Sequence, residues 1–264
     1  MEKGKSSKTI IIVVLVIIIL GLVGYIAYDK GVFSNKKKEV TSSKKEEKVT
    51  FDITYKDEEY LGKNSKGEVI ITNKRNIPNI ISNKKQDIAD KIVSDVKASS
   101  DEIWKQMNDQ ADDKNLLESG DKGLGSSLLY STAKQTDSYI SFKAEQSGGY
   151  GGVSWAGTSG AVYSTKTGEK LDLVDLAENE TEFKTFINDY TLKYLEKSDY
   201  QCLNDDWKST FNKYLFEDSY NLDDEGLNIY ISRYAIACGA DGTIIVKVPY
   251  NEANSYLKSE YKNK

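Results

Sequence analysis

The 264-residue sequence contains no histidine, only two cysteines and only two prolines. The lack of histidine excludes Ser-His-Asp and Cys-His nucleophiles, because both need an imidazole base. It also excludes the usual catalytic zinc sites with histidine ligands. With 36 Lys and Arg against 41 Asp and Glu, the net charge of -5 argues against a nucleic-acid partner, which normally requires a basic surface. These absences favour a binding or structural protein over an enzyme, and they predict no cofactor and no metal site.

An apolar block near the start is the strongest single signal that is present. Residues 9–28 contain no charged side chain, and a helix of that length spans roughly 30 Å, the thickness of the hydrocarbon core of a bilayer. The block is longer than the apolar part of a signal peptide and offers no small-residue cleavage site. We therefore expect an uncleaved transmembrane helix at 9–28, after a cytoplasmic tail at 1–8, with the rest of the chain outside the cell membrane.

Composition divides the remaining chain into three parts. Residues 29–49 are rich in lysine, serine and glutamate, which predicts a flexible tether. Alternating strands and helical patterns predict a small α+β subdomain at 50–127 and a second α+β domain at 128–264. Because strands are grouped with strands, the fold class is α+β, with antiparallel sheets packed with helices, rather than βαβ repeats.

Local signals place two helix starts and one turn. Asn83 and Asn179 are each followed three residues later by Gln or Glu, which predicts a helix N-cap. Asp241-Gly242 predicts a hairpin turn between two apolar runs. The helix after Asn179 carries aromatic residues at helical spacing, namely Phe183, Phe186, Tyr190 and Tyr194.

The segment from Ser147 to Trp155 is the most unusual local sequence. Its candidate partner-binding residues are Gly148, Gly149, Tyr150, Gly151, Gly152 and Trp155. Glycines leave backbone amides unshielded, and the two aromatic side chains are suited to stack on a sugar ring or to anchor a protein partner. The alternative is a β-bulge or wide hairpin turn that needs glycine only for its backbone.

The two cysteines are Cys202 and Cys238, and neither belongs to a C-x-x-C motif. Outside the membrane such an even pair suggests a disulfide. Two buried free thiols are the alternative.

Two stretches resemble one bacterial extracytoplasmic domain of unknown function, and the region around 50–110 resembles the smaller domain that usually precedes it. The first includes Gly226-Leu227-Asn228-Ile229-Tyr230, Tyr234-Ala235-Ile236-Ala237 and Val248-Pro249-Tyr250-Asn251-Glu252, and the second includes Tyr139-Ile140-Ser141-Phe142 and Thr167-Gly168-Glu169-Lys170-Leu171-Asp172-Leu173. This pair occurs in the ectodomain of the RsiV-type anti-sigma factor, which senses lysozyme, and beside the catalytic domain of a peptidoglycan deacetylase.

The resemblance implies an α+β ectodomain at the cell envelope that binds a wall glycan or a wall-active protein. The sequence departs from the family in two ways. Residues 1–8 are too short for the sigma-binding domain of the anti-sigma relatives, so we do not expect sigma-factor control through such a domain. The family's G-G-A-H-G loop lacks its histidine here, where it reads Gly148-Gly149-Tyr150-Gly151-Gly152, so no role of an imidazole is expected.

The sequence therefore predicts a membrane-anchored binding module that recognises a wall glycan or a wall-targeting protein such as lysozyme, with no catalytic residue. A hydrolase of wall polysaccharide that uses two carboxylates is one alternative, because 41 acidic residues make such a pair easy to propose. A purely structural, membrane-anchored interaction protein is the other. The oligomeric state is not indicated.

Overall fold

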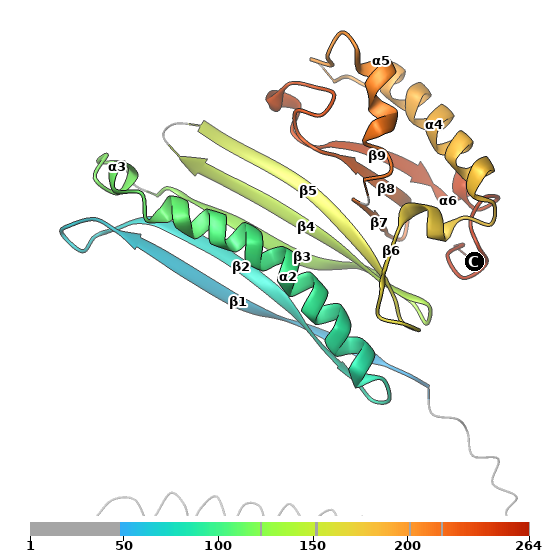
Figure 1. Ribbon diagram of the computed structural model, residues 1–264, viewed down its shortest axis with the longest axis horizontal. Coiled ribbons are helices and arrows are strands. Elements are labelled where there is room, and N and C mark those ends of the chain that lie inside the picture. Colours follow the sequence, from blue (N-terminus) through green and yellow to red (C-terminus); the bar gives the residue numbers. More distant parts are fainter. Residues whose placement is uncertain (1–47, 122, 151–152, 201, 218, 264) are drawn as a thin grey trace, which may run out of the picture. The chain divides into compact units, whose positions relative to one another are not determined.

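The computed structural model describes residues 48–121, 123–150, 153–200, 202–217 and 219–263 (Figure 1). Within these ranges, no helix has the length and apolar character needed to cross a bilayer. The predicted tail, the predicted transmembrane helix and nearly all of the predicted tether lie outside the described residues. Lys48–Lys264 form one compact unit.

Six strands form the large sheet, in the order β1-β2-β3-β4-β5-β6. They are β1 (Phe51–Lys63), β2 (Val69–Ser82), β3 (Gly125–Gln135), β4 (Tyr139–Tyr150), β5 (Val153–Ser164) and β6 (Lys170–Leu171). Neighbours are antiparallel except β2 and β3, which run parallel. Helix α2 (Gln86–Ala111) lies across one face of this sheet (Figure 1), where Ile92 and Val96 are buried in one cluster with Ile80 and Phe142.

Three antiparallel strands form a second sheet: β7 (Tyr220–Leu222), β8 (Gly226–Ile231) and β9 (Ile244–Pro249). This sheet lies between helix α4 (Glu180–Lys197) and the large sheet (Figure 1). The short elements are α3 (Lys114–Leu117), η1 (Leu173–Leu176), α5 (Trp207–Thr210), η2 (Phe211–Lys213), η3 (Gly239–Asp241) and α6 (Tyr250–Ala253). Tyr139 and Val162 of the large sheet belong to the same buried cluster as β7, β8, β9 and α4, so both sheets share one core.

The contact between β2 and β3, which we call the seam, is built differently from the other strand pairs. Only Lys74 and Arg75 of β2 are in register with β3. On either side, asparagine side chains replace backbone ladder bonds: Asn73 Oδ1 accepts from Ser126 N at 3.0 Å, and Asn76 Nδ2 donates to Tyr130 O at 3.0 Å. Side-chain amides therefore satisfy backbone groups that a full ladder would otherwise pair.

The structure confirms an α+β fold in which the strands are packed with helices, and the parallel β2–β3 pair makes the large sheet mixed. The large sheet continues across residue 127, so the subdomain division at 127/128 stays a prediction. Asn179 is the N-cap of α4 as predicted, because its side chain accepts from Thr181 N and Glu182 N.

Two local predictions are wrong. Helix α2 begins at Gln86 with Lys85 at its N-cap, whereas Asn83 Oδ1 accepts from Thr50 N at 2.9 Å and so holds the start of β1. Asp241-Gly242 is not a two-residue hairpin turn, because β8 ends at Ile231 and β9 begins only at Ile244. The longer connection contains Cys238 and η3.

Candidate binding site

The glycine-rich segment lies in paired strands rather than in an open loop. Gly148 is in register with Trp155 and Tyr150 with Val153, so most of the segment belongs to the β4–β5 hairpin. Gly151 and Gly152 lie outside the described residues. The register explains how strands tolerate this sequence: a Cβ on Gly148 would lie 2.7 Å from Cζ2 of Trp155, so the indole lies against the glycine backbone and shields it.

Gly148, Tyr150 and Trp155 point to one face of the hairpin, because alternate residues and cross-strand partners share a face. Gly149 is on the other face. The hydroxyl of Tyr150 donates to Asn73 Oδ1 at 3.0 Å, and the ring packs beside Ile70 and Ile71. Tyr150 therefore supports the seam, and the partner-binding role of these residues stays a prediction.

The structure joins Cys202 and Cys238 in a disulfide with a Cα–Cα distance of 5.5 Å. The backbone N–H of Cys202 also donates to Asp241 Oδ2 at 3.2 Å. Ligand atoms of these three residues lie within 4.8 Å of one another, which is the spacing of a metal site. Sulfur in a disulfide is not a thiolate, however, so Cys202, Cys238 and Asp241 do not form a metal site.

A groove of about 1320 Å³ lies along α4, and we call it the α4 groove. It is lined by Thr181, Glu182, Thr185, Phe186, Asp189, Tyr190, Lys193, Tyr194, Lys197, Ser198, Asp199, Tyr200, Glu252 and Tyr256. Most of these residues come from α4 and the turn after it, and the last two come from α6 and the segment that follows.

Aromatic rings form a ladder along this groove. Phe186, Tyr190 and Tyr194 are spaced four residues apart, so a helix places them on one face. Ring centroids are 5.8 Å apart for Phe186 and Tyr190 and 6.5 Å apart for Tyr190 and Tyr194. The ring of Tyr256 stacks on Phe186 at 4.2 Å. All four side chains are half-buried, so each ring is held by packing and still reaches the groove.

Hydrogen bonds fix two of the groove's tyrosines. The hydroxyl of Tyr190 donates to Lys247 O at 3.0 Å, and the hydroxyl of Tyr200 accepts from Ile245 N at 3.2 Å. Burial raises the pKa of Tyr190, and the charge of Glu252 raises it further. Burial likewise raises the pKa of Tyr194. Both phenols are therefore neutral at physiological pH.

The polar border of the α4 groove is mixed in charge. Its acidic side chains are Glu182, Asp189, Asp199 and Glu252, and its basic ones are Lys193 and Lys197. Carboxylates accept hydrogen bonds from hydroxyl groups, and ammonium groups donate them. Apolar ring faces beside such groups are the usual composition of a small-molecule or glycan site.

The helical spacing of Phe186, Tyr190 and Tyr194 is visible in the sequence, but it did not mark these residues as a site. The signal was tyrosine at four-residue intervals beside acidic residues, a composition more polar than that of a core-facing stripe. No sequence signal connects Tyr256 to Phe186, because only the fold brings α6 and the chain after it to α4.

Comparison with known proteins identifies a domain of one family. Residues 174–251 match the model of the family described as "Protein of unknown function (DUF3298)". A DUF3298 domain is therefore present, and it contains α4 with most residues of the α4 groove. Among curated proteins, none matches the chain.

Two solved structures match this chain. One is a member of the DUF3298 family from Bacteroides fragilis NCTC 9343, with a TM-score of 0.53 and 15% identity, covering 80% of this chain and 94% of that chain. The other is a DUF3298 family protein from Pseudomonas aeruginosa PAO1, with a TM-score of 0.49 and 17% identity, covering 81% of this chain and 98% of that chain. At such identities the first likeness shows the fold alone.

Proposed function

We propose that this chain is a membrane-anchored, extracytoplasmic binding module whose α4 groove holds a glycan of the cell wall. The aromatic ladder of α4 is the observation that carries the proposal. The apolar block at 9–28 supports the anchor, and the resemblance to the RsiV-type ectodomain and to the domains beside a peptidoglycan deacetylase supports the cell-envelope setting.

Sugar rings fit the chemistry of the ladder. A pyranose ring presents C–H groups on its faces, and the electron-rich faces of Phe186, Tyr190 and Tyr194 attract such groups. Its hydroxyls project from the ring edge toward the charged border, where Glu252 and Lys193 can accept and donate hydrogen bonds. Several rings in a row suit a linear polymer better than a single sugar.

Binding to the full-length chain in detergent micelles tests this proposal. The probes are soluble peptidoglycan fragments and oligomers of N-acetylglucosamine, measured by isothermal titration calorimetry. Tyr194→Ala removes one ring of the ladder, and no hydrogen bond of that hydroxyl is seen among the described residues. Loss of about 1–1.5 kcal/mol of ring contact weakens binding about tenfold.

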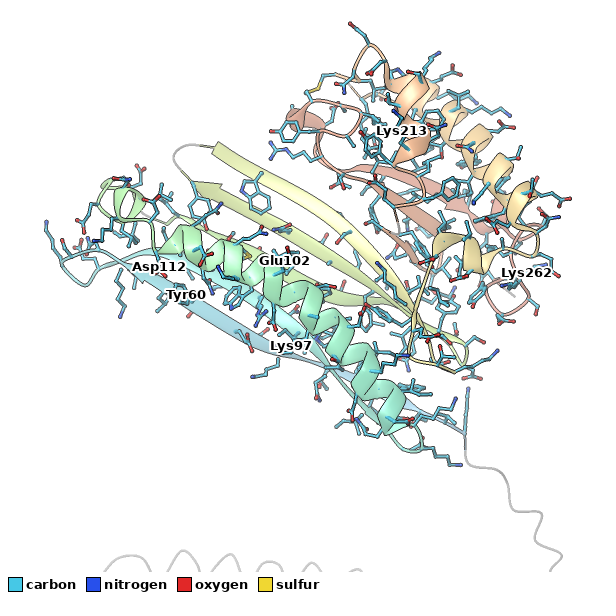
Figure 2. The ribbon with its side chains drawn as sticks, viewed as in Figure 1. Tyr60, Lys97, Glu102, Asp112, Lys213 and Lys262 are labelled. Atoms are coloured by element: carbon cyan, nitrogen blue, oxygen red, sulfur yellow. A yellow bond between two sulfur atoms is a disulfide. The ribbon has the colours of Figure 1, made fainter. Side chains whose placement is uncertain are left out.

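Tyr60→Ala is the matched control. Tyr60 is also half-buried, but its hydroxyl donates to Asp112 at 2.8 Å, near the far end of α2 (Figure 2). This variant is expected to bind glycan as the unmodified chain does. Failure of every glycan probe to bind, or equal weakening in both variants, contradicts the proposal.

Two further measurements on the same chain, titration with lysozyme and an assay of sugar release from peptidoglycan, separate the other candidates. Binding of lysozyme without binding of glycan favours recognition of a wall-targeting protein. Release of soluble sugars from peptidoglycan favours the hydrolase, for which the four carboxylates at the α4 groove supply a specific basis. In that case Glu182→Gln and Glu252→Gln, tested singly, identify the carboxylate on which sugar release depends.

A further inference from the structure

A second groove, of about 1040 Å³, lies between the ends of strands β2 to β5 and the connection from β8 to β9. We call it the strand-end groove. Its polar side chains include Lys74, Ser127, Ser147, Ser154, Arg233 and Asp241. It contains no residue of the α4 groove, and Gly148 and Trp155 of the glycine-rich segment also border it.

Arg233 is the cation that this groove holds in place. Its Nε donates to Gly239 O at 2.9 Å, and its guanidinium carbon lies 4.8 Å from the ring centroid of Tyr234. Among the described residues, no hydrogen bond or ion pair to its two terminal nitrogens is seen. A guanidinium fixed through Nε, with both terminal nitrogens available, has the geometry that binds a phosphate or carboxylate with two parallel hydrogen bonds.

The backbone around Arg233 is built to keep this arrangement. Tyr234 has a φ of 69°, and within the described ranges it is the one residue other than glycine in the left-handed region. Its ring lies directly on Gly239, where a Cβ would come within 2.5 Å of Cε1. Cys238, next to Gly239, is tied to Cys202 by the disulfide. A strained conformation held by a cross-link indicates preorganisation for binding, because less freedom is lost when a ligand arrives.

The opposite side of the groove adds a second cation and hydroxyl groups. Lys74 is exposed, and its ammonium lies 3.6 Å from Glu59, a distance at which an exposed pair contributes little. Ser127 and Ser147 share a hydrogen bond of 2.8 Å. Asp241 is the acidic side chain of the lining, and its carboxylate accepts the backbone N–H of Cys202. The described part of the lining thus has two cations and one carboxylate in a chain whose net charge is -5.

We propose that the strand-end groove binds an oxyanion, a phosphate or carboxylate group, with Arg233 as the bidentate contact and Lys74 as the second cation. The groove is larger than a single anion and so leaves room for an anionic polymer, of which one charged group reaches Arg233. This site is separate from the α4 groove and does not depend on the glycan proposal.

The test uses the full-length chain in detergent micelles and three probes: inorganic phosphate, an oligomer of glycerol phosphate and an oligomer of galacturonate. Binding is measured by calorimetry at low and at physiological salt. Arg233→Gln removes the guanidinium group and is expected to weaken binding of the oligomers about tenfold or more. Arg233→Lys keeps the charge but loses the bidentate geometry, so it is expected to recover only part of the affinity.

Lys213→Gln is the matched control, since Lys213 is an exposed cation outside this groove (Figure 2). Removal of the same charge there is expected to leave binding within about twofold.

Tighter binding of the glycerol phosphate oligomer identifies phosphate as the ligand group, and tighter binding of galacturonate identifies carboxylate. The proposal is overturned if no oligomer binds, if Arg233→Gln binds them normally, or if Lys213→Gln weakens binding equally. Normal glycan binding by Arg233→Gln would show that the two grooves act independently.

Discussion

At the scale of single residues, the approach of the two sheets depends on Gly160 in β5. A Cβ at this position would lie 2.6 Å from the carbonyl oxygen of Tyr220 in β7. That atom belongs to the backbone of a buried strand and cannot rotate away as a flexible side chain does. Nearby, the backbone N–H of Leu222 donates to Ser141 Oγ at 2.9 Å, so the same contact also satisfies a buried hydroxyl.

Gly160→Ala is therefore expected to destabilise the protein by about 1–3 kcal/mol, the usual cost of adding a methyl group to a packed contact. Gly157→Ala in the same strand is the control, because its nearest neighbour, Thr243 Oγ1, is 3.6 Å from the added Cβ. That change is expected to be neutral or to stabilise by about 0.5 kcal/mol, since alanine is less flexible than glycine when unfolded. Urea denaturation measures both, and equal midpoints would refute the argument.

At the scale of elements, the seam between β2 and β3 depends on side chains where other strand pairs use backbone. Asn76 both accepts from Tyr130 N and donates to Tyr130 O, so one amide side chain satisfies both groups of a half-buried residue. Asn73 Oδ1 accepts from Ser126 N, and Asn73 Nδ2 donates to Met107 O of α2 at 2.7 Å. These contacts connect the β1–β2–α2 part of the fold to the remaining strands.

Asn76→Ala leaves the N–H and C=O of Tyr130 without partners, and we expect it to cost about 1–3 kcal/mol of folding free energy. Asn79→Ala, in the same strand, removes only an exposed contact of 3.3 Å to Thr54 Oγ1 and is expected to change stability by about 0.5 kcal/mol or less. Hydrogen exchange of the Tyr130 amide provides a local readout. Unchanged protection of that amide in Asn76→Ala would contradict the assignment.

Elements with a strong periodic pattern were predicted from the sequence. The cap at Asn179 is confirmed, and so is the helix after it with aromatic residues at helical spacing, because both signals are local. Strand β3 was missed: Gly125–Gln135 contains several serines and little alternation, and its position is set by the asparagines of β2. Pairing with distant residues produces no periodic pattern within the segment itself.

The candidate site was predicted less well. Sequence rules predict that glycine-rich stretches form turns, and they cannot show that Trp155 of the next strand covers Gly148. The same limit applies to Arg233, whose partners are its neighbour Tyr234 and the more distant Gly239. What the sequence did contain was the four-residue spacing of aromatic residues in α4.

At the scale of the whole molecule, the disulfide closes a loop with a sequence separation of 36 residues. That loop contains α5, η2, β7 and β8, so the cross-link spans much of the second sheet. The neighbouring isolated pairing of Leu203 with Ala237 and the hydrogen bond from Cys238 N to Cys202 O, 3.0 Å, hold the two ends together in the folded state. The cross-link therefore mainly restricts the unfolded chain.

The double variant Cys202→Ser, Cys238→Ser is expected to lose about 2–4 kcal/mol of stability, which corresponds to a fall in Tm of about 5–15 °C for a protein of this size. Differential scanning calorimetry of the unmodified chain with and without dithiothreitol measures the same effect. If the reductant lowers the Tm of the double variant as well, the loss does not come from this bond.

The mixed order of the large sheet also has a mechanical consequence. If the chain is attached to the membrane before Lys48 and to the wall through α4, as proposed, tension enters at the start of β1 and leaves through α4. In the strand order of the large sheet this load has to cross from β2 to β3, which are joined by two register pairs, the asparagine side chains of the seam, two backbone hydrogen bonds of Leu124 and the packing of α2. Because this pair has fewer register pairs than β1–β2 or β3–β4, its rupture is expected before theirs under a pulling force, and it would extend the chain before β3 while α4 and the second sheet stay folded.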